Sequence, residues 1–135
     1  MWVPIAAGPT TSMRAEPYMA KIIEELGVRV IIGKGGMGDA TRKACAANGC
    51  VYLQAVGGAA QLLNQTVNSI DSVHFRREFG SAEAMWELDV HEFPAVVAMD
   101  SAGKSMYSSV KTASRRRLNK LLKNGSHKSR NGKSK

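Results

Sequence analysis

Two short segments hold the side chains of this sequence that could do chemistry. Residues 8–14 read Gly-Pro-Thr-Thr-Ser-Met-Arg, and residues 33–38 read Gly-Lys-Gly-Gly-Met-Gly. They supply the hydroxyl of Thr10, the guanidinium of Arg14 and the ammonium of Lys34. A guanidinium binds a carboxylate through two hydrogen bonds, and an ammonium beside a threonine favours its alkoxide or relays its proton. If the fold brings the segments together, they predict a site for a small carboxylate and for transfer of one proton.

The first segment also permits a structural interpretation. Its threonines and serine are followed by Glu16, which is a passable helix-capping sequence. In that case the hydroxyl groups would satisfy free backbone N–H groups and do no chemistry. On residue types alone, both interpretations stay open.

The glycine loop matches a dinucleotide-binding fingerprint by letter, with glycines at 33, 35 and 38 between an expected strand and an expected helix. No acidic residue occurs between Asp39 and Asp71, so the partner that binds ribose is missing. A phosphate-binding P-loop is excluded because the lysine is followed by glycine and not by serine or threonine. What remains is a loop whose N–H groups, with the positive end of the helix at Asp39, could approach an anion. The alternative is a tight turn that needs glycine only for geometry.

Helices and strands alternate around these segments, which predicts an α/β domain with a parallel sheet. A helix begins at Glu16 and ends at Gly27, and Asp39 caps a second helix. The further expected elements are strands at 28–32, buried on both faces, and 50–56; a helix from 57 to about 66; an extended segment from 73; and a hairpin of 95–99 with 105–107.

The positive charge is concentrated at the C-terminus. The chain has 135 residues and a formal net charge of +8, but residues 111–135 carry ten Lys/Arg and no acid. We predict a first domain at 1–110 and a basic tail at 111–135, with a short amphipathic helix at 114–123 and disorder at 125–135. The tail is either solvated or a contact for RNA, DNA or a membrane surface.

Two cysteines, Cys45 and Cys50, are too few for a disulfide framework or a zinc site, so we expect small buried residues in a reducing, cytoplasmic setting. No apolar run approaches about 18 residues, which argues against a membrane span. The first seven residues are too short and uncharged for a signal peptide.

Groups of residues spread over about 8–107 resemble, in order, the β region of the class I, iron–sulfur-dependent fumarate hydratases and tartrate dehydratases. The groups are 8–14, 32–35, 50–53 with 57–60, 78–80 with 83–86, and 93–97 with 99–101. The resemblance implies a swivelling β/β/α domain. It would face an α region, on the same or another chain, that carries a 4Fe-4S cluster, within a hetero- or homo-oligomer.

The implied activity is that of a hydro-lyase, which reversibly hydrates fumarate to L-malate or acts on L-tartrate, with the open iron serving as a Lewis acid. By matching position, Thr10 resembles the base that takes the carbon-bound proton. Arg14 resembles a ligand of the substrate carboxylate, and Lys34 a cation that binds substrate and helps to ionise the threonine. Thr11 fits a turn or cap better.

The sequence departs from this family in three ways. Only seven residues precede Gly8, where the family has strands and a further substrate-binding arginine, so we expect an N-terminally truncated domain. Ala15 stands where methionine is usual. Two cysteines cannot supply the three thiolates of a cluster, so the α partner must hold it and this chain alone should be inactive. The alternative is a non-catalytic remnant, or a binding module that acts through its basic tail.

Overall fold

The computed structural model describes residues 2–8 and 10–130, and within them the fold is mixed α/β. Helices α1 (Glu16–Leu26) and α2 (Asp39–Asn48) lie where the sequence predicts them. Pro17 stands in the first turn of α1, where its missing N–H costs nothing. Both helices end at a glycine in the left-handed region, Gly27 (φ 65°) and Gly49 (φ 64°).

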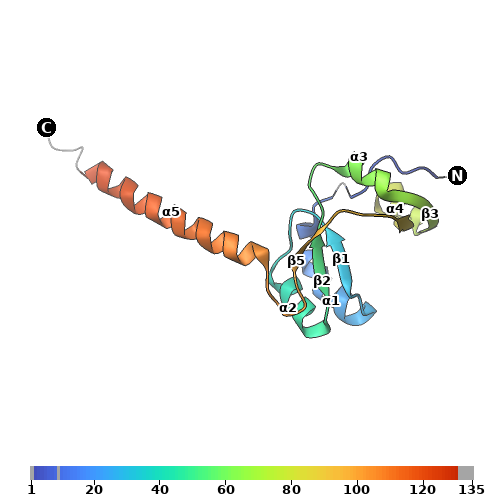
Figure 1. The fold of residues 1–135 in the computed structure, drawn as a ribbon, viewed down its shortest axis with the longest axis horizontal. Coiled ribbons are helices and arrows are strands. Elements are labelled where there is room, and N and C mark those ends of the chain that lie inside the picture. Colours follow the sequence, from blue (N-terminus) through green and yellow to red (C-terminus); the bar gives the residue numbers. More distant parts are fainter. Residues whose placement is uncertain (1, 9, 131–135) are drawn as a thin grey trace.

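The central sheet has the order β1-β2-β5 (Figure 1). Strand β1 (Val30–Gly33) runs parallel to β2 (Val51–Gln54), and β5 (Val96–Met99) runs antiparallel to β2. The prediction of a parallel sheet is therefore right for β1 and β2, whereas the extended segment predicted from residue 73 lies in another sheet and the strand predicted at 95–99 pairs antiparallel with β2. Because β1 ends at Gly33, the predicted glycine loop begins where this strand leaves the sheet.

One face of the sheet carries the core. Ile23 of α1, Cys45 of α2 and Cys50 are fully buried together. A neighbouring cluster joins the buried side chains of Met37, Tyr52, Ala98 and Met99. Helices α1 and α2 thus pack against β1 and β2 and fix both ends of the glycine loop.

The opposite face of the sheet is open. Val30, Ile32 and Val97 are 55%, 47% and 59% exposed, and the register of the strands places them on one face with Leu53. The prediction that residues 28–32 are buried on both faces is wrong, because successive side chains of a strand point to opposite faces and only one face is covered here.

Residues 57–94 differ most from the prediction. Within the helix predicted from 57 to about 66, only α3 (Ala60–Leu63) and a 3-10 turn, Asn64–Thr66, are helical, and strand β3 (Val67–His74) follows at once. Strand β3 pairs with β4 (Met85–Val90) in an antiparallel sheet of its own, and α4 (Arg76–Glu83) connects them. The apolar residues of β3 recur at every third position, Val67, Ile70 and Val73. This spacing goes with an irregular ladder, in which the register to β4 shifts twice. A search for strict alternation therefore misses this strand.

The C-terminal part also needs correction. The Asp100 carboxylate accepts hydrogen bonds from the N–H groups of Ala102 (3.0 Å) and Lys104 (2.8 Å), so the turn of the expected hairpin is present. Its second strand is not: Ser105 forms an isolated bridge to Met99.

Helix α5 (Met106–Arg130) starts directly after this bridge and extends away from the rest of the fold (Figure 1). It is longer than the predicted helix at 114–123. Residues 125–130, predicted to be disordered, belong to it, and the remainder of that prediction, 131–135, lies outside the described residues.

Candidate functional site

The two predicted segments meet at the end of β1. The Ser12 N–H donates to the Lys34 carbonyl oxygen at 3.0 Å, and the Lys34 N–H donates to Ser12 Oγ at 2.9 Å. The Lys34 ammonium, Nζ, donates to the Thr10 carbonyl oxygen at 2.5 Å. Thr10 and Lys34 are therefore neighbours, although they lie 24 positions apart in the sequence.

Thr10 and Lys34 line one cleft of about 330 Å³, a volume that fits a small ligand. Thr10 is exposed and Lys34 is half-buried. Ser12 is the other hydroxyl on the wall, and the remaining lining is apolar or glycine: Ala7, Gly8, Ile32, Gly33, Ala55, Leu63, Val90 and Phe93. The cleft thus combines hydroxyl groups, one cation and an apolar wall, which suits a small anion with a short carbon chain.

Arg14 is placed differently. It lies in a 3-10 turn, Ser12–Ala15, its side chain is exposed, and it is not among the described residues that line the cleft. The predicted convergence therefore holds for Thr10 and Lys34 within this chain and does not include Arg14.

The positive end of α2 is already occupied by a carboxylate of this chain. Glu16 accepts hydrogen bonds from the N–H groups of Gly38 (2.7 Å), Ala40 (3.1 Å) and Thr41 (3.2 Å), and from the Thr41 hydroxyl (2.6 Å). Burial raises the pKa of Glu16, but these hydrogen bonds together outweigh it and hold the pKa below its usual value of 4.5. The expectation that this helix end receives a ligand anion is not supported, because Glu16 fills the position.

The expected caps change accordingly. The N-cap residue of α2 is Gly38, and Asp39 forms ion pairs with Arg42 (2.7 Å) and Lys43 (3.3 Å) within the helix. Thr11 makes no side-chain cap bond to its own turn. Glu16, which we interpreted as part of a cap for its own helix, serves the neighbouring helix. Sequence reasoning missed this because the two partners come from different elements.

Two phenols lie behind the glycine loop. The ring of Tyr107 packs against Gly36, its hydroxyl donates to the Gln54 side-chain oxygen, and burial together with nearby Tyr52 raises its pKa to about 12. Tyr52 is fully buried, and burial also raises its pKa, although the Ser12 hydroxyl and the Gly36 N–H oppose the shift. The positive φ of Gly36, 82°, lets the loop lie against the Tyr107 ring.

The cysteines fit the interpretation of small buried residues and do not fit a cluster. Cys45 and Cys50 are both fully buried and free. Burial, and then the adjacent Cys50, raises the pKa of Cys45 to about 12, which opposes thiolate formation. Among the described residues, no group of three or more His, Cys, Asp or Glu side chains could hold a metal ion.

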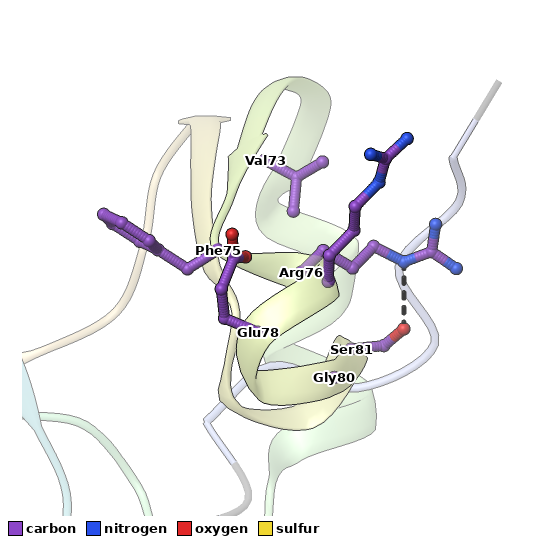
Figure 2. A pocket seen from close by; sticks show the side chains of 7 residues that line it. Val73, Phe75, Arg76, Glu78, Gly80 and Ser81 are labelled. Carbon is purple, nitrogen blue, oxygen red and sulfur yellow. Dashed lines mark hydrogen bonds between the residues drawn. The ribbon is translucent and has the colours of Figure 1, made fainter.

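A second hollow, of about 570 Å³, lies on α4 (Figure 2). Arg76 donates to the Ser81 hydroxyl there at 3.1 Å, and its guanidinium lies 4.4 Å from the centre of the Trp2 ring. Arg76 thus already interacts with two residues of this chain, Ser81 and Trp2. This hollow contains none of the candidate site residues Thr10, Arg14 and Lys34, although Glu78 and Gly80 belong to one of the groups that carry the family resemblance.

The described part of the chain contains no helix that is both long and apolar enough to cross a membrane.

The cleft with its hydroxyl groups and ammonium lies at the end of a strand in a mixed α/β fold. The Fumarase C-terminus family matches residues 1–110, and the chain belongs to this family. The match ends within α5, so the family covers the two sheets and the candidate site.

Individual relatives agree with this assignment. The chain is 45% identical over 120 residues to a protein of Geobacillus stearothermophilus designated as a class I fumarate hydratase, covering 89% of this chain and 23% of that protein. It is 43% identical over 122 residues to a protein of Methanocaldococcus jannaschii designated as the β subunit of L(+)-tartrate dehydratase, covering 90% and 63%. It is 37% identical over 106 residues to the L(+)-tartrate dehydratase β subunit of Escherichia coli strain K12, covering 78% and 52%. The chain thus spans less than two thirds of each relative.

Proposed function

We propose that this chain is the β subunit or β domain of a hydro-lyase that reversibly hydrates fumarate to L-malate together with an α partner. The observation that carries the proposal is the cleft in which Thr10 and Lys34 are held side by side. It lies within the region matched by the Fumarase C-terminus family. Two relatives are designated as β subunits, which supports a partner chain or domain for this one.

The residues of this chain would act on the proton and on the charge of the substrate. In the dehydration direction, Thr10 takes the proton from the carbon next to the hydroxyl-bearing carbon, and in the hydration direction it returns this proton. The half-buried Lys34 ammonium stabilises the threonine alkoxide and binds a substrate carboxylate. The exposed Arg14 would contact a substrate carboxylate when the domain swivels toward its partner.

The iron–sulfur cluster would be carried by the α partner. Both cysteines of this chain are buried, and no metal-binding group is formed among the described residues. When bound, such a 4Fe-4S cluster supplies Lewis acidity toward the substrate hydroxyl. We place the resulting hetero- or homo-oligomer in the cytoplasm, where free cysteines stay reduced.

The substrate could also be L-tartrate, because two of the relatives carry that designation. Fumarate hydration adds water to a dicarboxylate and tartrate dehydration removes water from one. Thr10 and Lys34 would have the same roles in either reaction. Steady-state assays of the complex with both substrates decide between them, since the preferred substrate is the one with the higher kcat/KM.

The first prediction tests the roles of the site residues. The chain is co-produced with a cluster-bearing α subunit, and fumarate consumption is followed by ultraviolet absorbance, with tartrate dehydration assayed in parallel. We expect T10A to lower kcat by roughly 100-fold or more, as loss of a positioned acid–base group does. K34A should lower kcat/KM by a similar factor with a raised KM.

T11A is the matched control, because it removes the neighbouring hydroxyl but leaves that of Thr10. A folded, cluster-loaded complex that is inactive toward both substrates would contradict the proposed function. Equal losses in T10A and T11A would contradict the assignment of the base.

A second candidate function is that of a binding module. It is favoured by α5, which extends from the fold and carries the excess positive charge. In that case the helix would bind a polyanion, whether or not the chain is part of an enzyme.

A further inference from the structure

We propose that Ser12 is a positioning residue that holds Lys34 beside Thr10, and its catalytic consequence rests on the proposed function. Ser12 engages both backbone polar groups of Lys34. Its N–H donates to the Lys34 carbonyl at 3.0 Å, and its Oγ accepts from the Lys34 N–H at 2.9 Å. We call these two hydrogen bonds the clamp. Because the acceptor of the second bond is the Ser12 side chain, that bond depends on the residue type at position 12.

The backbone of Lys34 lies where the chain leaves the sheet. The ladder of β1 ends one residue earlier, where the Gly33 carbonyl accepts from the Ala55 N–H at 2.7 Å. Beyond Lys34, Gly35 and Gly36 have φ of 79° and 82°. Glycine loses more conformational freedom on ordering than any other residue, so this side of the loop restrains Lys34 weakly. Ser12 thus bonds both backbone polar groups of Lys34 at the point where the strand gives way to the glycine loop.

The Ser12 hydroxyl lies in a confined space at the end of β1. A Cβ placed on Gly33 would overlap Ser12 Oγ and lie 2.7 Å from the Tyr52 hydroxyl oxygen. Ser12 itself is half-buried. Its hydroxyl thus lies against the end of β1 and the fully buried Tyr52. Alanine at position 12 would keep the backbone bond but leave the Lys34 N–H without its acceptor, which is costly in a partly buried place.

The clamp closes a ring between the two candidate site residues. Thr10 precedes Ser12 by two positions, and the Lys34 ammonium returns to the Thr10 carbonyl at 2.5 Å. Three hydrogen bonds therefore connect the residue that would accept the proton with the cation that would stabilise it. Displacing a positioned group by about 1 Å can cost roughly 100-fold in rate, so loosening Ser12 should reduce activity through Lys34.

A double-mutant cycle in the complex with the α subunit tests this. We expect S12A to lower kcat/KM by roughly 10- to 100-fold and to add nothing when Lys34 is already alanine, as coupled residues behave. S69A is the matched control, because Ser69 Oγ donates to the Asp71 carboxylate and Ser69 is not among the described residues that line the cleft, so kcat/KM should be unchanged. The proposal is overturned if S12A lowers kcat/KM by the same factor in the K34A background as in the unaltered chain. It is also overturned if S12A leaves kcat/KM unchanged while K34A lowers it.

Amide hydrogen exchange of the free chain separates this proposal from the proposed function. The Lys34 amide should exchange at least about ten times faster in S12A, because its acceptor is gone. The Cys50 amide, which donates to the Cys45 carbonyl at 2.9 Å, should be unchanged. Unchanged Lys34 protection overturns the clamp even if the complex is active. Faster exchange beside an inactive complex supports the clamp and rejects the hydro-lyase.

Discussion

Glu16 begins helix α1, yet its carboxylate satisfies the first backbone N–H groups of α2. The contact joins two elements and closes the far end of the glycine loop at Gly38. Gly38 leaves room for this contact, because a Cβ there would overlap Glu16 Oε1 and would displace the carboxylate. A negative charge at a helix N-terminus also interacts favourably with the helix dipole. One residue thus fixes the start of α2 and the end of the loop that carries Lys34.

This contact makes stability depend on pH. The folded-state pKa of Glu16 lies below 4.5, so its stabilisation is fully present above the unfolded pKa and is lost as the pH falls through the folded value. We expect E16Q to reduce the free energy of unfolding by about 1 kcal/mol near pH 7, and less as the pH falls below about 4. Urea unfolding at several pH values measures this, with E24Q as the control because Glu24 is exposed on the same helix. Identical pH profiles for E16Q and E24Q would refute the role of Glu16.

Sequence reasoning grouped Thr10 with Lys34 because their side chains could act together on a carboxylate, and the structure brings the two residues side by side. It missed Ser12, because a hydroxyl that accepts from the backbone of a distant residue follows no local motif. It also grouped Arg14 with the others, because spacing in the chain does not reveal how a 3-10 turn directs its side chains.

At the level of elements, the glycine loop is fixed where it touches α5. A Cβ on Gly36 would lie 3.2 Å from the Tyr107 ring, at a φ of 82°. Gly58 has nearly the same φ, 79°, with nothing within 4 Å of its Cβ. We expect G58A to cost about 1 kcal/mol from backbone strain and G36A about 2 to 3 kcal/mol, since strain and crowding add. Denaturant unfolding compares the two; equal losses would show that contact with Tyr107 contributes nothing.

The helices and first strands could be read from local signals, such as Pro17 and the glycines that end α1 and α2. Strands β3 and β4 could not, because Val67, Ile70 and Val73 do not alternate and the pairing is irregular. Tyr107 was expected in a strand, yet Ser105 Oγ accepts its N–H at 3.2 Å at the start of α5. A serine side chain that accepts the N–H two residues further on is a local signal that favours a turn or helix start over a strand, and the prediction of a hairpin passed over it.

In the molecule as a whole, the cluster of basic residues and the candidate site lie in different places. The candidate cleft lies at the end of β1, whereas the basic residues gather on α5, which extends away from the sheets (Figure 1). Exposed Leu118 and Leu121 accompany Arg115, Arg116 and Arg117 on this helix. The fumarase-type chemistry proposed for Thr10 and Lys34 uses none of these residues. The helix can therefore be tested independently of catalysis.

The binding-module hypothesis predicts that retention on a polyanion depends more on where the positive charges lie than on the net charge of the chain. Replacing Arg115, Arg116 and Arg117 together by glutamine should abolish retention of the chain on heparin, whose polyanion binds clustered cations in a salt-dependent way. A control variant, K21Q/R29Q/K104Q, loses the same three charges from the body and should still be retained. Elution salt concentration measures both. If the two variants elute together, or if the unaltered chain is not retained, α5 is no specific polyanion site, and its charge only keeps an exposed helix solvated.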